Sequence, residues 1–312
     1  MSVPQFGDMN ALLERVNYKV RQGRKRCAFV VGSGLTRGEV PGTEEMIGVL
    51  RRHLGDAKTR RHFDLSITAS IPSEKYQQAA AFARQYRGQE FLNDVVRRCT
   101  LKACDRRIPS RSRWNEDALE VAETDYPWTL GAGVVSLGEA MTIIPHKSRG
   151  PILTTNFDPL LEIAIQQTGG NHDCQVIDDD YKIRRSTNSN AVGIVHMHGY
   201  WRMGNTLHTA LQLRRARPEL AVSLRETLRD KFLVVIGYGG WSDAFTRSLL
   251  KRIEEKDSLG MEIAWSRFSS FDSSSLGSSV AGKLLRGLNE TDLYEGIDAN
   301  TFFPKLVDKL KE

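Results

Sequence analysis

Six short apolar runs, separated by stretches with helical periodicity, constrain the fold of this chain more than any other sequence feature. The runs are residues 27–31, 151–155, 174–177, 193–198, 232–236 and 262–265, and helical patterns lie between several of them, for example at 159–167 and 219–228. Alternation of strands and helices produces a parallel sheet with helices on both faces. The sequence therefore predicts an α/β fold, a Rossmann-like, doubly wound and mainly parallel sheet.

Residues 60–147 differ from the rest of the chain. Apolar residues recur there at helical spacing, as in Phe91, Leu92, Val95 and Val96, and no convincing strand pattern is present. We interpret this stretch as a helical insertion subdomain within a single catalytic domain that spans residues 1–312. Residues 269–280 contain seven serines and are predicted to form a loop.

Composition excludes several classes of protein. Of the 312 residues, 40% are hydrophobic, and no run of roughly 18 apolar residues is available to span a membrane. The N-terminus lacks the pattern of a secretion signal, and four scattered cysteines suit a reducing cytoplasm. The net charge of +6 is compatible with an anionic ligand, but we do not expect direct nucleic-acid binding or a membrane partner.

The first run ends in a glycine-rich turn, with Gly32, Ser33, Gly34 and Thr36. Glycines at this place allow the backbone to approach a pyrophosphate closely, and amides near a helix start can donate to it. The turn lacks the G-x-G-x-x-G spacing of dehydrogenases, so a tight strand-to-helix turn without a ligand is an equal alternative.

The second run ends in polar residues, which include Thr155, Asn156 and Asp158. Ligands of doubly wound sheets sit beyond the carboxyl ends of the strands, so these side chains are placed where a ligand would bind. Helix capping before Pro159 is an alternative for Asp158, but it does not explain the whole string.

The run 193–198 ends in His196 and His198, which share one face if the strand continues through both. Three interpretations remain open for this pair: a metal site, buried structural histidines, or a general base at His198. No carboxylate or third histidine nearby completes a metal site, and an imidazole is suited to proton transfer at neutral pH.

A second glycine-rich turn follows the run 232–236 and contains Gly237, Tyr238, Gly239, Trp241 and Asp243. The aromatic side chains could pack on a ring, and Asp243 could accept ribose hydroxyls. An ordinary strand-to-helix turn with Ser242 as the helix cap is the alternative. All four motifs follow strands of one predicted parallel sheet, so we expect them to converge on one crevice.

In this order, the four motifs resemble those of the sirtuin superfamily, and more narrowly the sirtuin-type domains of bacterial anti-phage defence proteins. The resemblance covers residues 27–47 and 150–266. It implies that NAD+ is the substrate and that Asn156 and His198 are catalytic. It also implies that the cofactor-binding residues are Gly32, Ser33, Gly34, Thr36, Thr155, Asp158, Gly237, Tyr238, Gly239 and Asp243.

Two departures separate this chain from protein-deacylating sirtuins. It lacks their four-cysteine zinc module, and residues 40–44 lack the Asp-Phe-Arg string that follows the first glycine turn in those enzymes. These departures weaken the deacylase interpretation. The resemblance then implies an NAD+ glycohydrolase without a metal, the NAD-depleting effector of a defence system, and we expect it to be gated by homo-oligomerisation or by a partner sensor or ATPase. Alternatives are an NAD-dependent deacylase, a cyclase product and a non-catalytic module that senses NAD or ADP-ribose.

Overall fold

The computed structural model describes residues 6–105, 116–184, 186, 188, 190–255, 260–270, 276, 279–288 and 290–312. Most of the serine-rich segment 269–280 therefore lies outside the described residues.

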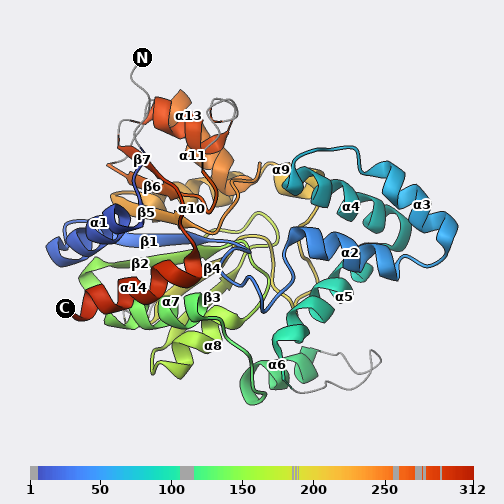
Figure 1. Cartoon of the computed structure of the whole chain (residues 1–312), viewed down its shortest axis with the longest axis horizontal. Helices are drawn as coiled ribbons and strands as arrows, with labels where there is room; N and C mark the ends of the chain where they lie inside the picture. Colours follow the sequence, from blue (N-terminus) through green and yellow to red (C-terminus); the bar gives the residue numbers. More distant parts are fainter. Residues whose placement is uncertain are drawn as a thin grey trace.

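A single seven-stranded sheet organises the molecule (Figure 1). Every pair of neighbouring strands runs parallel, which confirms the predicted doubly wound α/β fold. Across the sheet the strands are β3 (His172–Val176), β4 (Val192–His196), β2 (Arg149–Thr154), β1 (Arg26–Val31), β5 (Lys231–Ile236), β6 (Glu262–Ser266) and β7 (Thr291–Tyr294).

Strand side chains alternate between two hydrophobic cores. In β1, Phe29 and Val31 belong to one core, and Ala28 and Val30 belong to the other. The first core is completed by α1 (Met9–Gln22), α7 (Ala132–Ile143), α8 (Leu160–Gln167) and α14 (Ala299–Lys311). The second is completed by α10 (Pro218–Leu228), α11 (Ala244–Glu254) and α13 (Val280–Gly287). Burial on both faces explains why the central strands β1 and β5 are almost uniformly apolar.

The described chain between β1 and α7 is helical and contributes no strand to the sheet, and its first helix begins before residue 60, where the sequence pattern places the start of the insertion. Its helices are α2 (Thr43–His53), α3 (Ala57–Ser66), α4 (Pro72–Arg87), α5 (Gln89–Thr100), the 3-10 turn Leu101–Ala103 and α6 (Glu116–Asp125). α2 packs on α4 and α5, and α3 packs on α4, beside the sheet (Figure 1). We call α2 to α5 the helical layer. α7 packs instead on α8 and α14, and the short α9 (Ala210–Arg214) contacts α4 from the sheet side.

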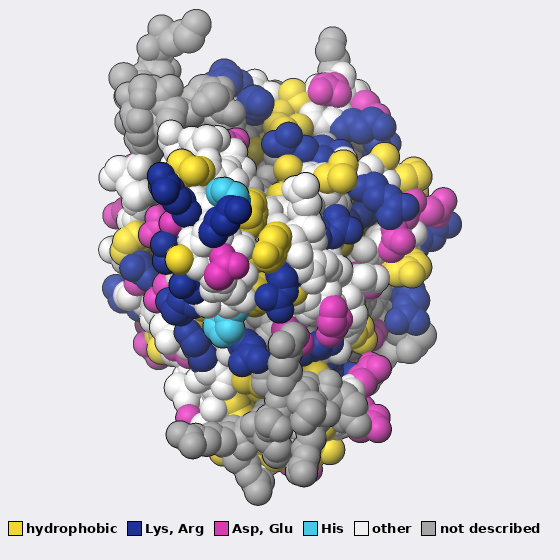
Figure 2. All heavy atoms as spheres, turned by 90° about the vertical axis from the view of Figure 1, so that its right-hand side faces the viewer, with side chains coloured by type: hydrophobic (Ala, Val, Ile, Leu, Met, Phe, Trp, Pro, Cys, Tyr) yellow, Lys and Arg dark blue, Asp and Glu magenta, His cyan; other side chains and the backbone are white. Residues whose placement is uncertain are grey.

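The face that the helical layer presents to solvent carries many Lys and Arg side chains, interspersed with Asp and Glu (Figure 2). No described helix is both long and apolar enough to cross a membrane.

The six predicted runs correspond to β1 to β6, and the 3-10 turn His146–Ser148 leads into β2. The sequence patterns do not predict β7, which is only four residues long and has an exposed Asp292. β4 ends at His196, two residues before the predicted end, so His198 lies in the loop that follows the strand.

Candidate active site

The ends of four strands lie level at the carboxyl edge of the sheet. Val31 at the end of β1 pairs with Thr154 of β2 on one side and with Ile236 of β5 on the other, and Thr154 pairs with His196 of β4. The chain leaves β1 toward β2 first and returns to the opposite side of β1 only at β5, which makes this edge the topological switch point. The four motifs of the sequence therefore meet at one place.

The two glycine turns contact each other directly. The amide of Gly34 donates to the carbonyl of Gly237 at 3.0 Å, and a Cβ atom added to Gly34 would lie 2.7 Å from Cα of Gly237. A Cβ on Gly32 would lie 2.9 Å from the same carbonyl oxygen, and Gly237 itself has φ +68°. Close packing of two backbones thus explains these three glycines without a ligand.

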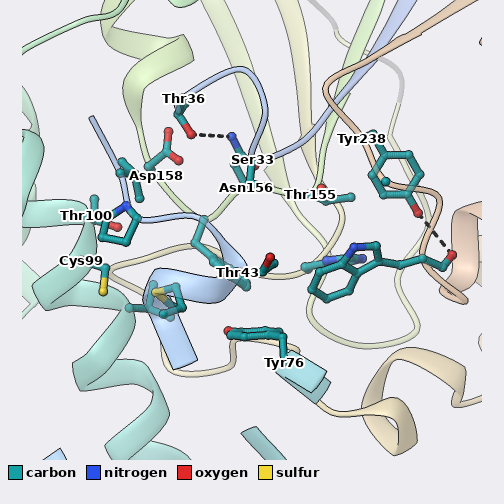
Figure 3. A pocket seen from close by; sticks show the side chains of 18 residues that line it. Ser33, Thr36, Thr43, Tyr76, Cys99, Thr100, Thr155, Asn156, Asp158 and Tyr238 are labelled. Atoms are coloured by element: carbon teal, nitrogen blue, oxygen red, sulfur yellow. Dashed lines mark hydrogen bonds between the residues drawn. The ribbon is translucent and has the colours of Figure 1, made fainter. Parts of the chain in front are cut away.

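A cavity lies between this edge of the sheet and the helical layer (Figure 3). From the sheet edge it is lined by Ser33, Thr36, Thr155, Asn156, Phe157, Asp158, His198, Tyr238, Gly239 and Trp241. From the other side it is lined by Val40, Pro41, Thr43, Met46, Tyr76, Val96, Cys99 and Thr100. Asn156 and His198, which come from different strands, therefore share one cavity. Of the residues predicted for the site, Gly32, Gly34, Gly237 and Asp243 do not line it.

The cavity volume is about 80 Å³. Sites for small molecules usually enclose roughly 300–1,000 Å³, so the helical layer closes the crevice to less than the size of a typical ligand site.

Asn156 is held from three elements. Its side-chain Nδ2 donates to Oγ1 of Thr36 in the loop after β1, at 3.1 Å, and its backbone amide donates to Oγ1 of Thr154 at 3.1 Å. Its carbonyl accepts a hydrogen bond from Nδ1 of His196, at 2.8 Å. The carboxamide is thus fixed where it faces the cavity (Figure 3).

His196 forms a buried ion pair with Glu162 of α8, whose Oε1 lies 2.7 Å from Nε2. Burial lowers the pKa of His196, but the adjacent Glu162 carboxylate outweighs it and holds the pKa well above its ordinary value. Both ring nitrogens face acceptors, so the ring carries two protons. Glu162, Cys174 and His196 form a group whose ligand atoms all lie within 4.8 Å of one another, but the ion pair already uses the imidazole.

His198 has a different carboxylate partner, since its Nε2 lies 3.0 Å from Oδ2 of Asp243. The two histidines of the motif therefore do not converge on a common ligand position. Asp243 is buried and also accepts from the Tyr238 hydroxyl at 2.6 Å and from the Thr246 amide at 3.0 Å, as the N-cap of α11. Its oxygens thus accept hydrogen bonds within the protein, and Asp243 does not itself line the cavity.

Asp158 faces the cavity with few partners (Figure 3). Its carboxyl accepts one hydrogen bond from the backbone amide of Leu160, at 3.4 Å. Burial raises the pKa of Asp158 to about 6, so this carboxyl binds a proton more tightly than an exposed aspartate does.

A buried polar network fastens the helical layer to the loop after β4. Tyr76 of α4 lies against Nδ1 of His208 at 2.6 Å, and Nε2 of His208 lies 2.6 Å from Oγ1 of Thr206. The Thr206 hydroxyl donates to Oδ1 of Asn93 in α5, at 2.9 Å, and Asn93 donates to the Gly204 carbonyl. Burial, with the nearby His198, lowers the pKa of His208 to about 3, so this ring is neutral.

The sequence patterns do not identify the helical side of the cavity. Tyr76 and Cys99 lie on ordinary amphipathic helices, with no glycine turn or strand end beside them. Burial raises the pKa of Cys99 to about 11, so its thiol is not activated. Only the packing of α4 and α5 brings these residues to the cavity.

Comparison with known proteins places this site in context. Residues 151–273, less than half of the chain, match the family model described as a SIR2-like domain. That segment contains Asn156, His198 and Asp243. No curated protein matches the sequence.

Solved structures with a similar arrangement are remote. A Sir2 homologue in complex with NAD is 10% identical, with a TM-score of 0.49, over 98% of this chain and 96% of that one. A mutant Sir2 homologue in complex with ADP-ribose is 10% identical, with a TM-score of 0.45, over 96% of each chain. A structure of a Sir2 enzyme is 11% identical, with a TM-score of 0.44, over 98% of each chain.

Proposed function

The chain carries a sirtuin-like domain, and from this premise we propose that the protein is an NAD+ glycohydrolase that releases nicotinamide and ADP-ribose. The observation that carries the proposal is the shared cavity of Asn156 and His198 at the switch point of the sheet. A fixed carboxamide and an imidazole at the carboxyl edge of a doubly wound sheet are suited to binding and cleaving a dinucleotide.

The chemistry requires little acid catalysis. Nicotinamide leaves NAD+ as a neutral molecule without protonation, so the barrier lies in the oxocarbenium character that develops at the ribose carbon. Asn156, held by Thr36 and His196, would position the water or the ribose beside that carbon. His198 would accept a proton from the water or from a ribose hydroxyl, a contribution of typically 10²–10⁴-fold.

Access to the site requires movement of the helical layer. A cavity of about 80 Å³ cannot hold a dinucleotide, so we propose that the helical layer is a lid and that its closed position restrains turnover. Homo-oligomerisation or a partner sensor or ATPase would open it. Such restraint fits an effector that depletes NAD+ during anti-phage defence, because unrestrained turnover would harm the host.

Product analysis tests the proposed function. The purified protein is incubated with NAD+ over a range of protein concentrations, and the products are separated by chromatography. Nicotinamide and ADP-ribose formed in equal amounts in a reaction without peptide support hydrolysis. A cyclic product would instead identify the protein as a cyclase. O-acyl-ADP-ribose formed only with an acylated peptide would favour a deacylase, and tight binding without nicotinamide release would favour a sensing module.

A further inference from the structure

We infer that Asp243 is a positioning residue that selects the tautomer of His198, so that Nδ1, and not Nε2, is the nitrogen that accepts the proton in the reaction. The inference rests on the proposed function for its catalytic meaning, but the tautomer itself is a property of the folded protein. It gives Asp243 a role in the site other than ribose binding.

The hydrogen bonds of the imidazole define its protonation. Nε2 of His198 lies 3.0 Å from Oδ2 of Asp243, and an ionised carboxylate can only accept. Nε2 therefore carries the hydrogen, and in the neutral ring the lone pair is left on Nδ1. His198 lines the cavity. Within the described part of the chain, its Nε2 is hydrogen-bonded to Asp243, and no group forms a hydrogen bond with its Nδ1.

The carboxylate of Asp243 is in turn locked in place. Oδ1 accepts the backbone amide of Thr246 at 3.0 Å, as the N-cap of α11, which leaves Oδ2 toward His198. The Tyr238 hydroxyl donates to the same Oδ2 at 2.6 Å. Burial raises the pKa of Asp243, but the hydrogen bonds from His198, Tyr238 and the Thr246 amide outweigh burial, so the net pKa is lowered and the group is ionised.

These contacts make Asp243→Asn a specific probe. The Thr246 amide still needs an acceptor, so the oxygen of the new amide stays on that side and its NH₂ group turns toward Tyr238 and His198. An NH₂ group can only donate, so Nε2 of His198 must become the acceptor and the hydrogen must move to Nδ1. Nδ1 would then have no lone pair to accept a proton, although the ring and the fold are retained.

The test combines nitrogen NMR of histidine with kinetics. The protein is labelled with ¹⁵N-histidine, and the signals of His198 are assigned by their loss in His198→Gln. We expect the Nε2–H tautomer in the wild-type protein and the Nδ1–H tautomer in Asp243→Asn. In the same variant we expect NAD+ turnover to fall by about 10²–10⁴-fold, as for loss of a general base, while the affinity for ADP-ribose changes less than about threefold.

Two further variants separate positioning from structural damage. Asp298→Asn makes the same change at the N-cap of α14 and should leave the His198 tautomer and turnover unchanged. Tyr238→Phe keeps the Asp243 carboxylate and should keep the Nε2–H tautomer. An Nδ1–H tautomer in the wild-type protein, or an unchanged tautomer in Asp243→Asn, overturns the inference. Failure of the wild-type protein to cleave NAD+ would overturn the proposed function alone, since the NMR result does not depend on turnover.

Discussion

His196 donates through Nδ1 to the backbone carbonyl of Asn156, at 2.8 Å. This hydrogen bond connects the buried ion pair of His196 and Glu162 to the residue whose carboxamide faces the cavity. The other ring nitrogen of His196 faces Glu162, so one imidazole connects α8 with the loop after β2. His198, two residues further along the chain, lines the cavity itself. The two histidines of one motif thus have separate carboxylate partners, Glu162 and Asp243.

The Glu162–His196 pair should make stability depend on pH. Burial lowers the pKa of His196, but attraction to Glu162 outweighs burial and raises the pKa above the unfolded value near 6.5. The stabilisation that the ion pair gives to the folded protein is therefore fully present below pH 6.5, and it is lost as the pH rises through the pKa of His196 in the folded protein. Glu162→Gln should lower the free energy of unfolding by about 1.5–3 kcal/mol near pH 6, and by less near pH 9. Urea denaturation of both proteins at several pH values measures the difference. Glu120→Gln, at an exposed carboxylate, serves as the control and should change stability by less than about 0.5 kcal/mol.

Asn156→Ala and His198→Ala should each reduce NAD+ turnover by at least about 10²-fold, because the first removes positioning and the second removes the base. Nicotinamide release, measured by chromatography, reports the rate, and circular dichroism checks the fold. Asn171→Ala and His62→Ala change exposed residues of the same types and should retain full turnover. Wild-type rates in both site variants would refute the site assignment.

Asp158→Asn should stabilise the protein at neutral pH. Burial raises the pKa of Asp158 to about 6, so the folded state loses stability as pH rises from about 4 to about 6, where the unfolded chain is already ionised. Removing the buried charge should raise the free energy of unfolding by up to about 3 kcal/mol at pH 7 and by almost nothing at pH 4. A gain of equal size at both pH values would contradict this explanation.

Gly34→Ala should destabilise the fold by about 1–3 kcal/mol, because the added Cβ would lie 2.7 Å from Cα of Gly237 and backbone cannot rotate away. Gly239→Ala is the matched control in the second glycine turn, where a Cβ would meet only the Trp241 side chain at 3.5 Å. Thermal unfolding of both variants compares the two positions. Equal losses at both would show that contact between the turns does not explain Gly34.

Thr206→Val should loosen the helical layer. The substitution preserves shape but removes the hydroxyl that joins His208 to Asn93. We expect faster hydrogen exchange in α4 and α5, unchanged exchange in the sheet and, if the layer is a lid, a lower KM for NAD+. Thr142→Val removes a hydroxyl that bonds only within α7 and is the control. Unchanged protection of α4 and α5 would show that this network does not hold the layer closed.

The sequence alone determined the sheet and one side of the cavity. Apolar runs of four to six residues that are followed by glycine or polar residues predicted the strands β1 to β6. With these strands, the sequence also predicted that Asn156 and His198 meet at one edge of the sheet. The order of the strands across the sheet and their register were not predicted, because apolar runs identify strands but do not specify which strands pair. The sequence did not predict β7, because its four residues, which include the exposed Asp292, show too little apolar pattern to be identified as a strand.

Only the tertiary structure decided which partners the polar residues contact. The contacts of Asp243 with His198 and of His196 with Glu162 join residues far apart in the chain, and no local spacing encodes such contacts. The sequence also did not predict that the helical layer, with Tyr76, lines the cavity. The pattern of an amphipathic helix specifies that one face is buried but not which surface covers that face. The sequence gives the chemistry of each side chain, whereas tertiary packing determines which other group that side chain contacts.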